Sequence, residues 1–177
     1  MNTIDQVVLV NELDEKTGLM EKMEAHEKAL LHRAFSVFIF NKNGELLLQR
    51  RAHDKYHSGG LWTNTCCSHP RPGENPEDGA VRRLMEEMGF ETPLKKVFDF
   101  VYKASFANGL SEHEFDHVYV GYYDGPINPD PKEVNEYLYR SMQDIQYSLV
   151  SEDGLFTAWF KIIFPKMMHW WNENFSK

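Results

Sequence analysis

One segment, residues 32–51, constrains the fold of this chain more than any other. It consists of HRAFSVFIFNKNGELLLQRR, in which large apolar side chains recur on both sides of the dipeptide Asn43-Gly44. Aromatic and β-branched runs of this kind are typical of strands, and Asn-Gly is strongly favoured in tight hairpin turns. The segment therefore predicts a β-hairpin, which must be covered by further elements to be stable in water.

The other segments predict more strands, one inserted helix and two helices at the end. Strands are predicted at residues 5–12, 95–106, 114–123 and 136–142, which are rich in Val, Phe and Tyr. Helices are predicted at residues 19–31, 77–88, 142–151 and 155–173, the first as a helix or a helical loop and the last stopped or kinked around Pro165. Gly89 is expected to end the second helix. This order predicts an α+β fold, a mixed β-sheet flanked by helices.

The length and charge of the chain limit its organisation and its partners. A chain of 177 residues without linkers suits a single domain, residues 1–177. Its net charge of −8 and the lack of a basic tract argue against nucleic acid as a partner. An acidic protein can still bind an anionic small molecule through a local basic pocket or a metal ion.

The cellular location is predicted from the termini and the cysteines. The N-terminal residues lack the features of a secretory signal, and no stretch approaches the ~20 apolar residues of a membrane span. The two cysteines, Cys66 and Cys67, are neighbours and cannot join distant parts of the chain. We therefore expect a cytoplasmic protein with reduced thiols and no membrane contact.

The segment TNTCCSHP, residues 63–70, places these cysteines just before His69. The residues alone leave three interpretations open: packing thiols, a metal site or a catalytic thiol. Their spacing excludes a zinc site of the Cys-x-x-Cys type. Neighbouring side chains of an extended segment point to opposite sides, so one thiol can line a pocket while the other packs behind it.

The charged helix at residues 77–88 and the loop before it resemble the Nudix box, which directs carboxylates at divalent metal ions and pyrophosphate. The matching residues are Glu74, Arg82, Glu86, Glu87 and Gly89. Ser68 replaces the first glycine of the motif and Arg83 replaces a glutamate, and an arginine there would bind diphosphate rather than activate water. The resemblance implies a Nudix-like α/β/α sandwich with impaired hydrolysis, whereas charge spacing alone would also suit an exposed helix.

Three segments in the same order resemble one divergent branch of the Nudix superfamily, the type I isopentenyl-diphosphate isomerases. They are LLHRAFSVFIF, NTCCSHP preceded by Trp62, and SEHEF. The resemblance covers most of the chain and implies an enzyme that interconverts isopentenyl and dimethylallyl diphosphate, by protonation to a tertiary carbocation and deprotonation. The alternatives are a Nudix pyrophosphohydrolase acting on a nucleoside or isoprenoid diphosphate, and a non-catalytic module that binds metal or diphosphate.

The resemblance also implies a metal site of three histidines and two glutamates. The matching residues are His26, His32, His69, Glu112 and Glu114. Such ligands suit manganese, magnesium or zinc, and the nitrogen ligands favour a transition metal over magnesium alone. Glu112 and Glu114 are two residues apart, so on a strand both point to one face and His113 points away.

The reacting groups are likewise implied by the resemblance. Cys67 matches the catalytic thiol, Glu114 the carboxylate that faces it, and Tyr102 a tyrosine that assists the glutamate. Which of Cys67 and Glu114 gives the proton is left open. Trp159 matches a tryptophan over the carbocation, where an indole face stabilises positive charge. Cys66 is then expected to pack as a small apolar residue.

The diphosphate is expected to bind to cations and to a second metal ion. The residues that match its phosphate contacts are Lys22, Arg51, Lys55 and Arg83. Magnesium bridging the diphosphate would be held by Glu87 and the backbone carbonyl of Cys67, consistent with the preference of magnesium for few carboxylates plus substrate phosphates.

Overall fold

A computed structural model describes residues 6–152 and 154–175 of the chain. The strands are β1 (Gln6–Val10), β2 (Lys16–Glu21), β3 (His32–Phe40), β4 (Leu46–Arg51), β5 (Trp62–Thr63), β6 (Cys66–Ser68), β7 (Lys95–Ser105), β8 (Ser111–Tyr122) and β9 (Val134–Arg140). The helices are α1 (Lys22–Glu27), α2 (Pro76–Met88), α3 (Met142–Ser151) and α4 (Ala158–Phe175). None of these described helices is long and apolar enough to cross a membrane.

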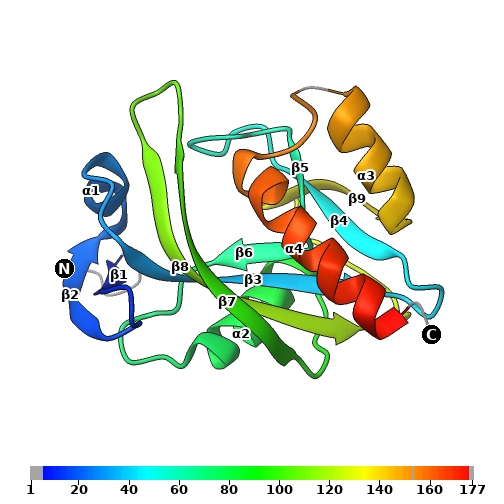
Figure 1. Ribbon diagram of the computed structural model, residues 1–177, viewed down its shortest axis with the longest axis horizontal. Coiled ribbons are helices and arrows are strands. Elements are labelled where there is room, and N and C mark those ends of the chain that lie inside the picture. The colour runs from blue at the N-terminus through cyan, green and yellow to red at the C-terminus, as the bar shows by residue number, and fades with distance from the viewer. Residues whose placement is uncertain (1–5, 153, 176–177) are drawn as a thin grey trace.

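The centre of the structure is strand β3, which lies in a mixed sheet (Figure 1). It pairs in parallel with β8 along its whole length, from His32 opposite Glu114 to Phe40 opposite Tyr122. On its other side it pairs antiparallel with β6 and, at one position, with β1. The parallel pair within an otherwise antiparallel sheet confirms the predicted mixed sheet.

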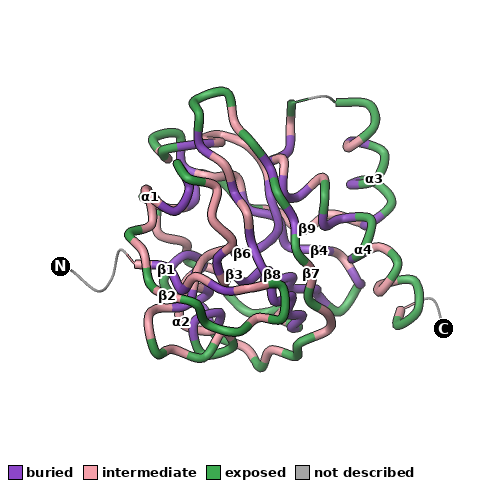
Figure 2. The backbone as a smooth tube through the Cα atoms, turned by 60° about the vertical axis from the view of Figure 1, so that its left-hand side comes forward, coloured by how far each residue is buried: buried purple, intermediate pink, exposed green. Residues whose placement is uncertain are grey.

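Side chains of β3 alternate between two apolar clusters, one on each face of the sheet. Phe38 and Phe40 pack with residues of α3 and α4, whereas Phe35, Val37 and Ile39 pack with residues of α2. All five are fully buried, and each such side chain contributes roughly 1.5–3 kcal/mol to folding. The sheet is thus a middle layer between α2 and the α3–α4 pair, as Figures 1 and 2 show, and the predicted α/β/α sandwich is confirmed.

The predicted hairpin forms only at its turn. Strands β3 and β4 are both present, but Phe40 and Leu46 are their one paired position, and β4 continues beside β5 and β9. Thr65 lies where the hairpin would close: its hydroxyl accepts a hydrogen bond from the Ile39 amide and donates to the Leu47 carbonyl. A side chain that satisfies both backbone groups lets the two strands separate at no cost in buried hydrogen bonds.

The N-terminal predictions need correction at two boundaries. The strand predicted at residues 5–12 is observed at Gln6–Val10, and residue 5 lies outside the described part. The helix predicted at residues 19–31 is limited to α1, because residues 16–21 form β2 beside β1. Pairing with the apolar strand β1 outweighs the helix propensity of this segment, which is a weak preference.

Helix α2 begins one residue before the predicted range, residues 77–88, and ends at the predicted Gly89. The Asn75 side chain accepts a hydrogen bond from the Glu77 amide at the N-terminus, and Pro76 occupies the first turn. Gly89 ends the helix with a φ of 77°. Helix α4, in contrast, is not stopped by Pro165 but continues through it. Phe164 and Met167 on either side are buried, and this burial offsets the roughly 3 kcal/mol cost of an interior proline.

We expect Gly89→Ala to lower the free energy of unfolding more than Gly109→Ala. Both glycines have a positive φ, 77° and 85°, which costs any other residue about 1–2 kcal/mol. A Cβ at Gly89 would also lie 2.1 Å from the Asn128 carbonyl oxygen, whereas at Gly109 no described atom lies within 4 Å. Urea unfolding of both variants measures the difference, expected to be about 1 kcal/mol or more. Equal losses would show that the chain around Asn128 relaxes without cost.

Candidate active site

A cavity of about 70 Å³ lies at the end of the sheet where β3 begins. It is lined by Lys22, Arg51, Lys55, Tyr56, His57, Cys67, Ser68, His69, Arg83, Glu87, Tyr102, Glu112, Glu114, Glu133 and Trp159. All the predicted site residues except His26 and His32 belong to this lining. Those two are fully buried and their rings contact that of His69, at centroid distances of 5.5 and 4.9 Å. The structure therefore brings together residues from α1, α2, α4 and five strands.

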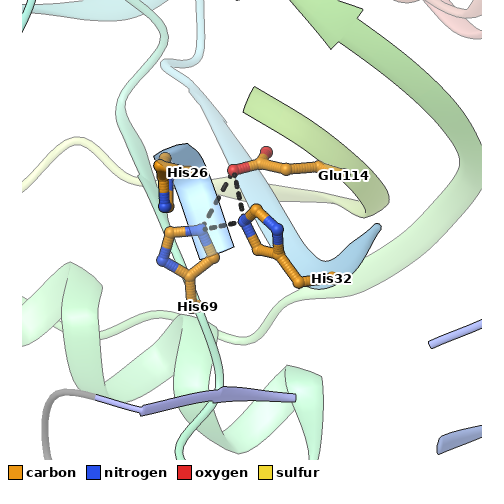
Figure 3. A group of neighbouring side chains, drawn as sticks. All are labelled: His26, His32, His69 and Glu114. Carbon is orange, nitrogen blue, oxygen red and sulfur yellow. Dashed lines mark hydrogen bonds and ion pairs between the residues drawn. The ribbon is translucent and has the colours of Figure 1, made fainter. Parts of the chain in front are cut away.

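Three histidines and one glutamate converge beside the cavity (Figure 3). One ligand atom from each of His26, His32, His69 and Glu114 lies within 4.8 Å of the others. His69 Nε2 is 3.0 Å from Glu114 Oε1 and 3.2 Å from His32 Nε2. The pairing of β3 with β8 brings His32 opposite Glu114, α1 supplies His26, and His69 follows directly after β6.

The histidine rings are oriented by backbone carbonyls behind them. His26 Nδ1 donates to the Lys22 carbonyl at 2.6 Å, and His32 Nδ1 donates to the Leu30 carbonyl at 2.8 Å. Each ring therefore directs an Nε2 lone pair at the centre of the group, as is usual for metal-ligating histidines. His26 Nε2 is buried and has no hydrogen-bond partner among the described residues. This unsatisfied atom and the nitrogen–oxygen donor set fit a divalent metal ion.

Glu112, the fifth predicted ligand, lies outside this group. Its Oε2 accepts from the Tyr102 hydroxyl at 3.0 Å, and its Oε1 is 3.5 Å from His57 Nε2. Glu112 and Glu114 do point to one face of β8, as predicted, since both line the cavity. His113 between them does not line it, and its Nδ1 donates to the Ala29 carbonyl.

The two carboxyl groups differ in their acidity. Burial and the neighbouring Glu114 raise the pKa of Glu112 well above its usual range. Burial acts on Glu114 in the same direction, but His32 and His69 outweigh it and hold the pKa of Glu114 well below its usual range. The Tyr102 hydroxyl, 2.6 Å from Glu114 Oε2, bridges the pair. Opposed pKa shifts in neighbouring carboxyls are typical of sites that perform acid–base chemistry.

The two cysteines face opposite sides of β6, as the extended segment predicts. Cys66 is fully buried in the cluster against α2, whereas Cys67 lines the cavity and packs with Trp159. The Cys67 thiol donates to Asn64 Oδ1 at 3.0 Å. Burial and the nearby Asp116 raise the pKa of Cys67, so the thiol stays protonated.

Four predicted cations line the cavity and are paired with acidic or aromatic groups. Lys55 pairs with Glu133, and Arg83 Nη2 lies 2.7 Å from Glu87 Oε1. The Arg51 guanidinium is 5.1 Å from the Trp159 ring centroid, and Lys22 Nζ is 4.7 Å from that of Tyr56. Burial and the neighbouring Arg51 lower the pKa of Lys22. Arg and Lys side chains in such pairs can also form charge-assisted hydrogen bonds with the oxygens of an anionic ligand.

Sequence reasoning missed four residues of this site: Tyr56, His57, Asn64 and Glu133. His57 stacks on Phe106, with ring centroids 4.6 Å apart. Phe106, Trp159 and Glu112, which face His57, come from segments far away in sequence, so the loop AHDKYHSGG carries no local signal for its role. Asn64 stands within the quoted run NTCCSHP, and its amide nitrogen donates to the carbonyls of Val37 and Cys66. Its place two residues before the cysteine pair was the one available signal.

Comparisons with known proteins show which family this chain is similar to. A family model described as NUDIX domain matches residues 30–160. An isopentenyl-diphosphate Delta-isomerase of Pectobacterium atrosepticum is 49% identical over 168 residues, which cover 95% of this chain and 94% of that protein. Another, of Burkholderia multivorans, is 46% identical and covers 94% of this chain and 97% of its own length.

Solved structures agree on the fold. A crystal structure of DR0079 from Deinococcus radiodurans superimposes with a TM-score of 0.76 and 17% identity, over 91% of this chain and 98% of that one. A MutT protein from Methanosarcina mazei gives a TM-score of 0.64 and 19% identity, over 78% and 94% of the two chains. At such identities the likeness concerns the fold alone.

We expect the metal-free protein to lose stability below pH 6.5, and His69→Asn to reduce this loss. Burial lowers the pKa of His69 to about 3, against roughly 6.5 in the unfolded chain. Between these values the unfolded chain binds one more proton at this residue, so stability falls as the pH falls. The free energy of unfolding of chelated protein can be measured with urea between pH 6 and pH 4. Its slope against pH should be about 1.4 kcal/mol per pH unit smaller in the variant than in the wild type. Identical slopes would mean that His69 is protonated in the folded protein.

Proposed function

Because the chain belongs to the isopentenyl-diphosphate Delta-isomerase family, within the NUDIX-domain proteins, we propose that it interconverts isopentenyl diphosphate and dimethylallyl diphosphate. It is an enzyme that moves a carbon–carbon double bond, acting as a single domain. The observation that carries this proposal is the pair formed by Cys67 and Glu114. The two side chains line one cavity from β6 and β8, the strands on either side of β3.

Moving a terminal double bond to the internal position adds a proton to one carbon and removes a proton from another. The reaction therefore needs an acid and a base beside the same short hydrocarbon chain. Cys67 is held protonated by burial and Glu114 is held ionised by its histidine neighbours. In this state the pocket is prepared for the direction in which Cys67 donates the proton. In the opposite direction the two groups exchange roles, as a reversible reaction requires.

Tyr102 and Trp159 support the two proton transfers. The Tyr102 hydroxyl donates to Glu114 and so orients the carboxylate. Because a hydroxyl can also accept a hydrogen bond, it can stay paired with Glu114 when that group is protonated. Trp159 is 4% exposed, and its ring already holds the Arg51 guanidinium in a cation–π contact. The same indole stabilises a desolvated tertiary carbocation by about 2 kcal/mol. Exclusion of water once the substrate fills the cavity would keep that cation from being trapped.

The metal site is part of the proposal. His26, His32, His69 and Glu114 would hold manganese, magnesium or zinc, with Glu112 as a further ligand. When bound, the ion supplies positive charge that keeps Glu114 ionised and fixes its position. Neutral imidazoles are the form that ligates metals, and burial lowers the pKa values of His26 and His69 accordingly.

The diphosphate would bind among Lys22, Arg51, Lys55 and Arg83, which concentrate positive charge in a protein whose net charge is −8. Glu87 lines the same cavity, accepts hydrogen bonds from Gln49 and Arg83, and with the Cys67 carbonyl would hold magnesium that accompanies the diphosphate. In place of the Nudix glutamate, Arg83 argues against the pyrophosphohydrolase alternative, because a guanidinium cannot act as a base.

We place the enzyme in the cytoplasm. Both cysteines are free thiols, and the chemistry requires Cys67 in its reduced form. A five-carbon diphosphate is the small-molecule partner, and the net charge of −8 argues against nucleic acid as a further one.

The test is proton NMR of isopentenyl diphosphate incubated with the protein, magnesium and manganese in deuterated water. We expect dimethylallyl signals with deuterium incorporated into the carbon chain, because each turnover adds one proton from a group that exchanges with solvent. Chelated protein is the control and should leave the substrate unchanged. Unchanged carbon signals together with a cleaved diphosphate would identify a hydrolase instead.

The two cysteines provide a matched pair of variants. We expect Cys67→Ala to lower kcat by at least about 10³-fold while diphosphate binding survives, because it removes a proton donor and leaves the cations in place. Cys66→Ala should change kcat little, since that thiol packs against α2. Both rates can be followed by the NMR assay, and diphosphate binding by calorimetry. Full activity of Cys67→Ala would exclude this thiol from the mechanism.

A further inference from the structure

His57 is a buried polar side chain with one nitrogen left unpaired. Its side chain is 2% exposed and lines the cavity. Nδ1 lies 3.3 Å from the Ser58 hydroxyl, but Nε2 has no hydrogen bond within the described part of the chain. Buried polar atoms in folded proteins are nearly always paired, so an unpaired one points to a partner or a ligand.

Aromatic rings fix the direction of the imidazole. It stacks on Phe106 at an interplanar angle of 12° and meets the edges of Trp159 and Tyr56 at 82°. The ring centroids lie between 4.4 and 5.5 Å from that of His57. Packing on three sides leaves the imidazole little freedom to rotate, so the position of Nε2 is built into the cavity wall.

Glu112 Oε1, 3.5 Å away, lies opposite Nε2, just beyond hydrogen-bond length. The other oxygen of Glu112 shares the Tyr102 hydroxyl with Glu114, at 3.0 and 2.6 Å. A hydroxyl has one hydrogen, and the shorter contact goes to Glu114. Glu112 therefore shares its Tyr102 partner with Glu114, and His57 is the side chain placed to supply a second partner.

We propose that His57 is a positioning residue that sets the orientation of the Glu112 carboxylate. The inference rests on the metal site of the proposed function, because Glu112 is the predicted ligand outside the group of four. Nε2 donates or accepts according to the tautomer of the ring, so it can pair with Glu112 in either protonation state. Held between His57 and Tyr102, Glu112 stays within reach of the metal site. Partners behind metal ligands commonly change metal affinity by 10–100-fold when they are replaced.

In the experiment the protein is first stripped of metal with a chelator. It is then titrated with Mn²⁺ without substrate, and electron paramagnetic resonance measures its affinity for the ion. We expect His57→Phe, which keeps the stacking on Phe106 and loses both nitrogens, to bind Mn²⁺ about 10-fold more weakly. His57→Gln places an amide near Nε2 and should recover much of the affinity. His53→Phe is the matched control, because His53 lies in the same loop but is exposed and outside the cavity.

A double-mutant cycle shows whether His57 acts through Glu112. Glu112→Gln should also weaken Mn²⁺ binding, and adding His57→Phe to it should weaken binding no further. Unchanged affinity in His57→Phe, or losses that simply add in the double variant, would overturn the inference alone. Wild-type protein that binds no Mn²⁺ would refute the metal site and the inference together. If His57→Phe does not fold, His57→Leu, which also lacks both nitrogens, takes its place in the same comparison.

Discussion

The parallel pairing of β3 with β8 is the constraint that brings the parts of the candidate site together. Parallel neighbours cannot be joined by a tight turn, so the chain between them must form a long crossover. Here residues 41–110 form that connection and include β4 to β7 and α2. The crossover returns β6 to the free side of β3, and His69 follows it to the same end of the sheet. One register, with His32 opposite Glu114, thus assembles the histidine–glutamate group from distant segments.

The location of that group at the end of the core decides its chemical state. Removal from water disfavours charge, so His69 is held neutral and the Cys67 thiol is held protonated. Glu114 escapes this trend because two histidines and the Tyr102 hydroxyl surround its carboxylate. Each group is therefore in the protonation state that metal ligation or proton transfer requires. Burial is the physical cause for His69 and Cys67. Small changes in packing near the cavity are therefore expected to alter the pKa values of these groups, because they change how far each group is buried.

Sequence reasoning predicted the helices and strands that are specified by residues within them or next to them. Helix α2 was predicted at residues 77–88 from its helix-forming residues and from Gly89 at its end, and it is observed at Pro76–Met88. Contacts between distant segments were beyond such reasoning. The hairpin at β3 and β4 opens because the Thr65 hydroxyl replaces backbone partners, and α4 continues through Pro165 because its neighbours are buried.

The same distinction holds for the site. Resemblance to a family located residues that line the cavity, but it could not show that Glu112 lies beside Tyr102 and outside the group of His26, His32, His69 and Glu114. His57 was missed because two of the three rings that surround it come from the distant residues 106 and 159. Adjacent positions on one strand were predictable, whereas the orientation of a carboxylate depends on side chains that only the fold brings near.

Helix α2 shows how one motif serves both fold and chemistry. Arg82 forms two hydrogen bonds with Glu74, at 2.7 and 2.8 Å, and so fastens the loop before the helix to its second turn. Arg83 and Glu87, one turn apart, point instead into the cavity. The Nudix-box carboxylates Glu74 and Glu86 thus bind arginines. Among the described residues, the group that could hold a metal ion is instead His26, His32, His69 and Glu114, beside β3 and β8. Glu74 and Arg82 of the motif therefore stabilise the fold. Arg83, which lines the cavity, is suited to binding a diphosphate, and Cys67 and Glu114 are the groups that would perform the acid–base chemistry.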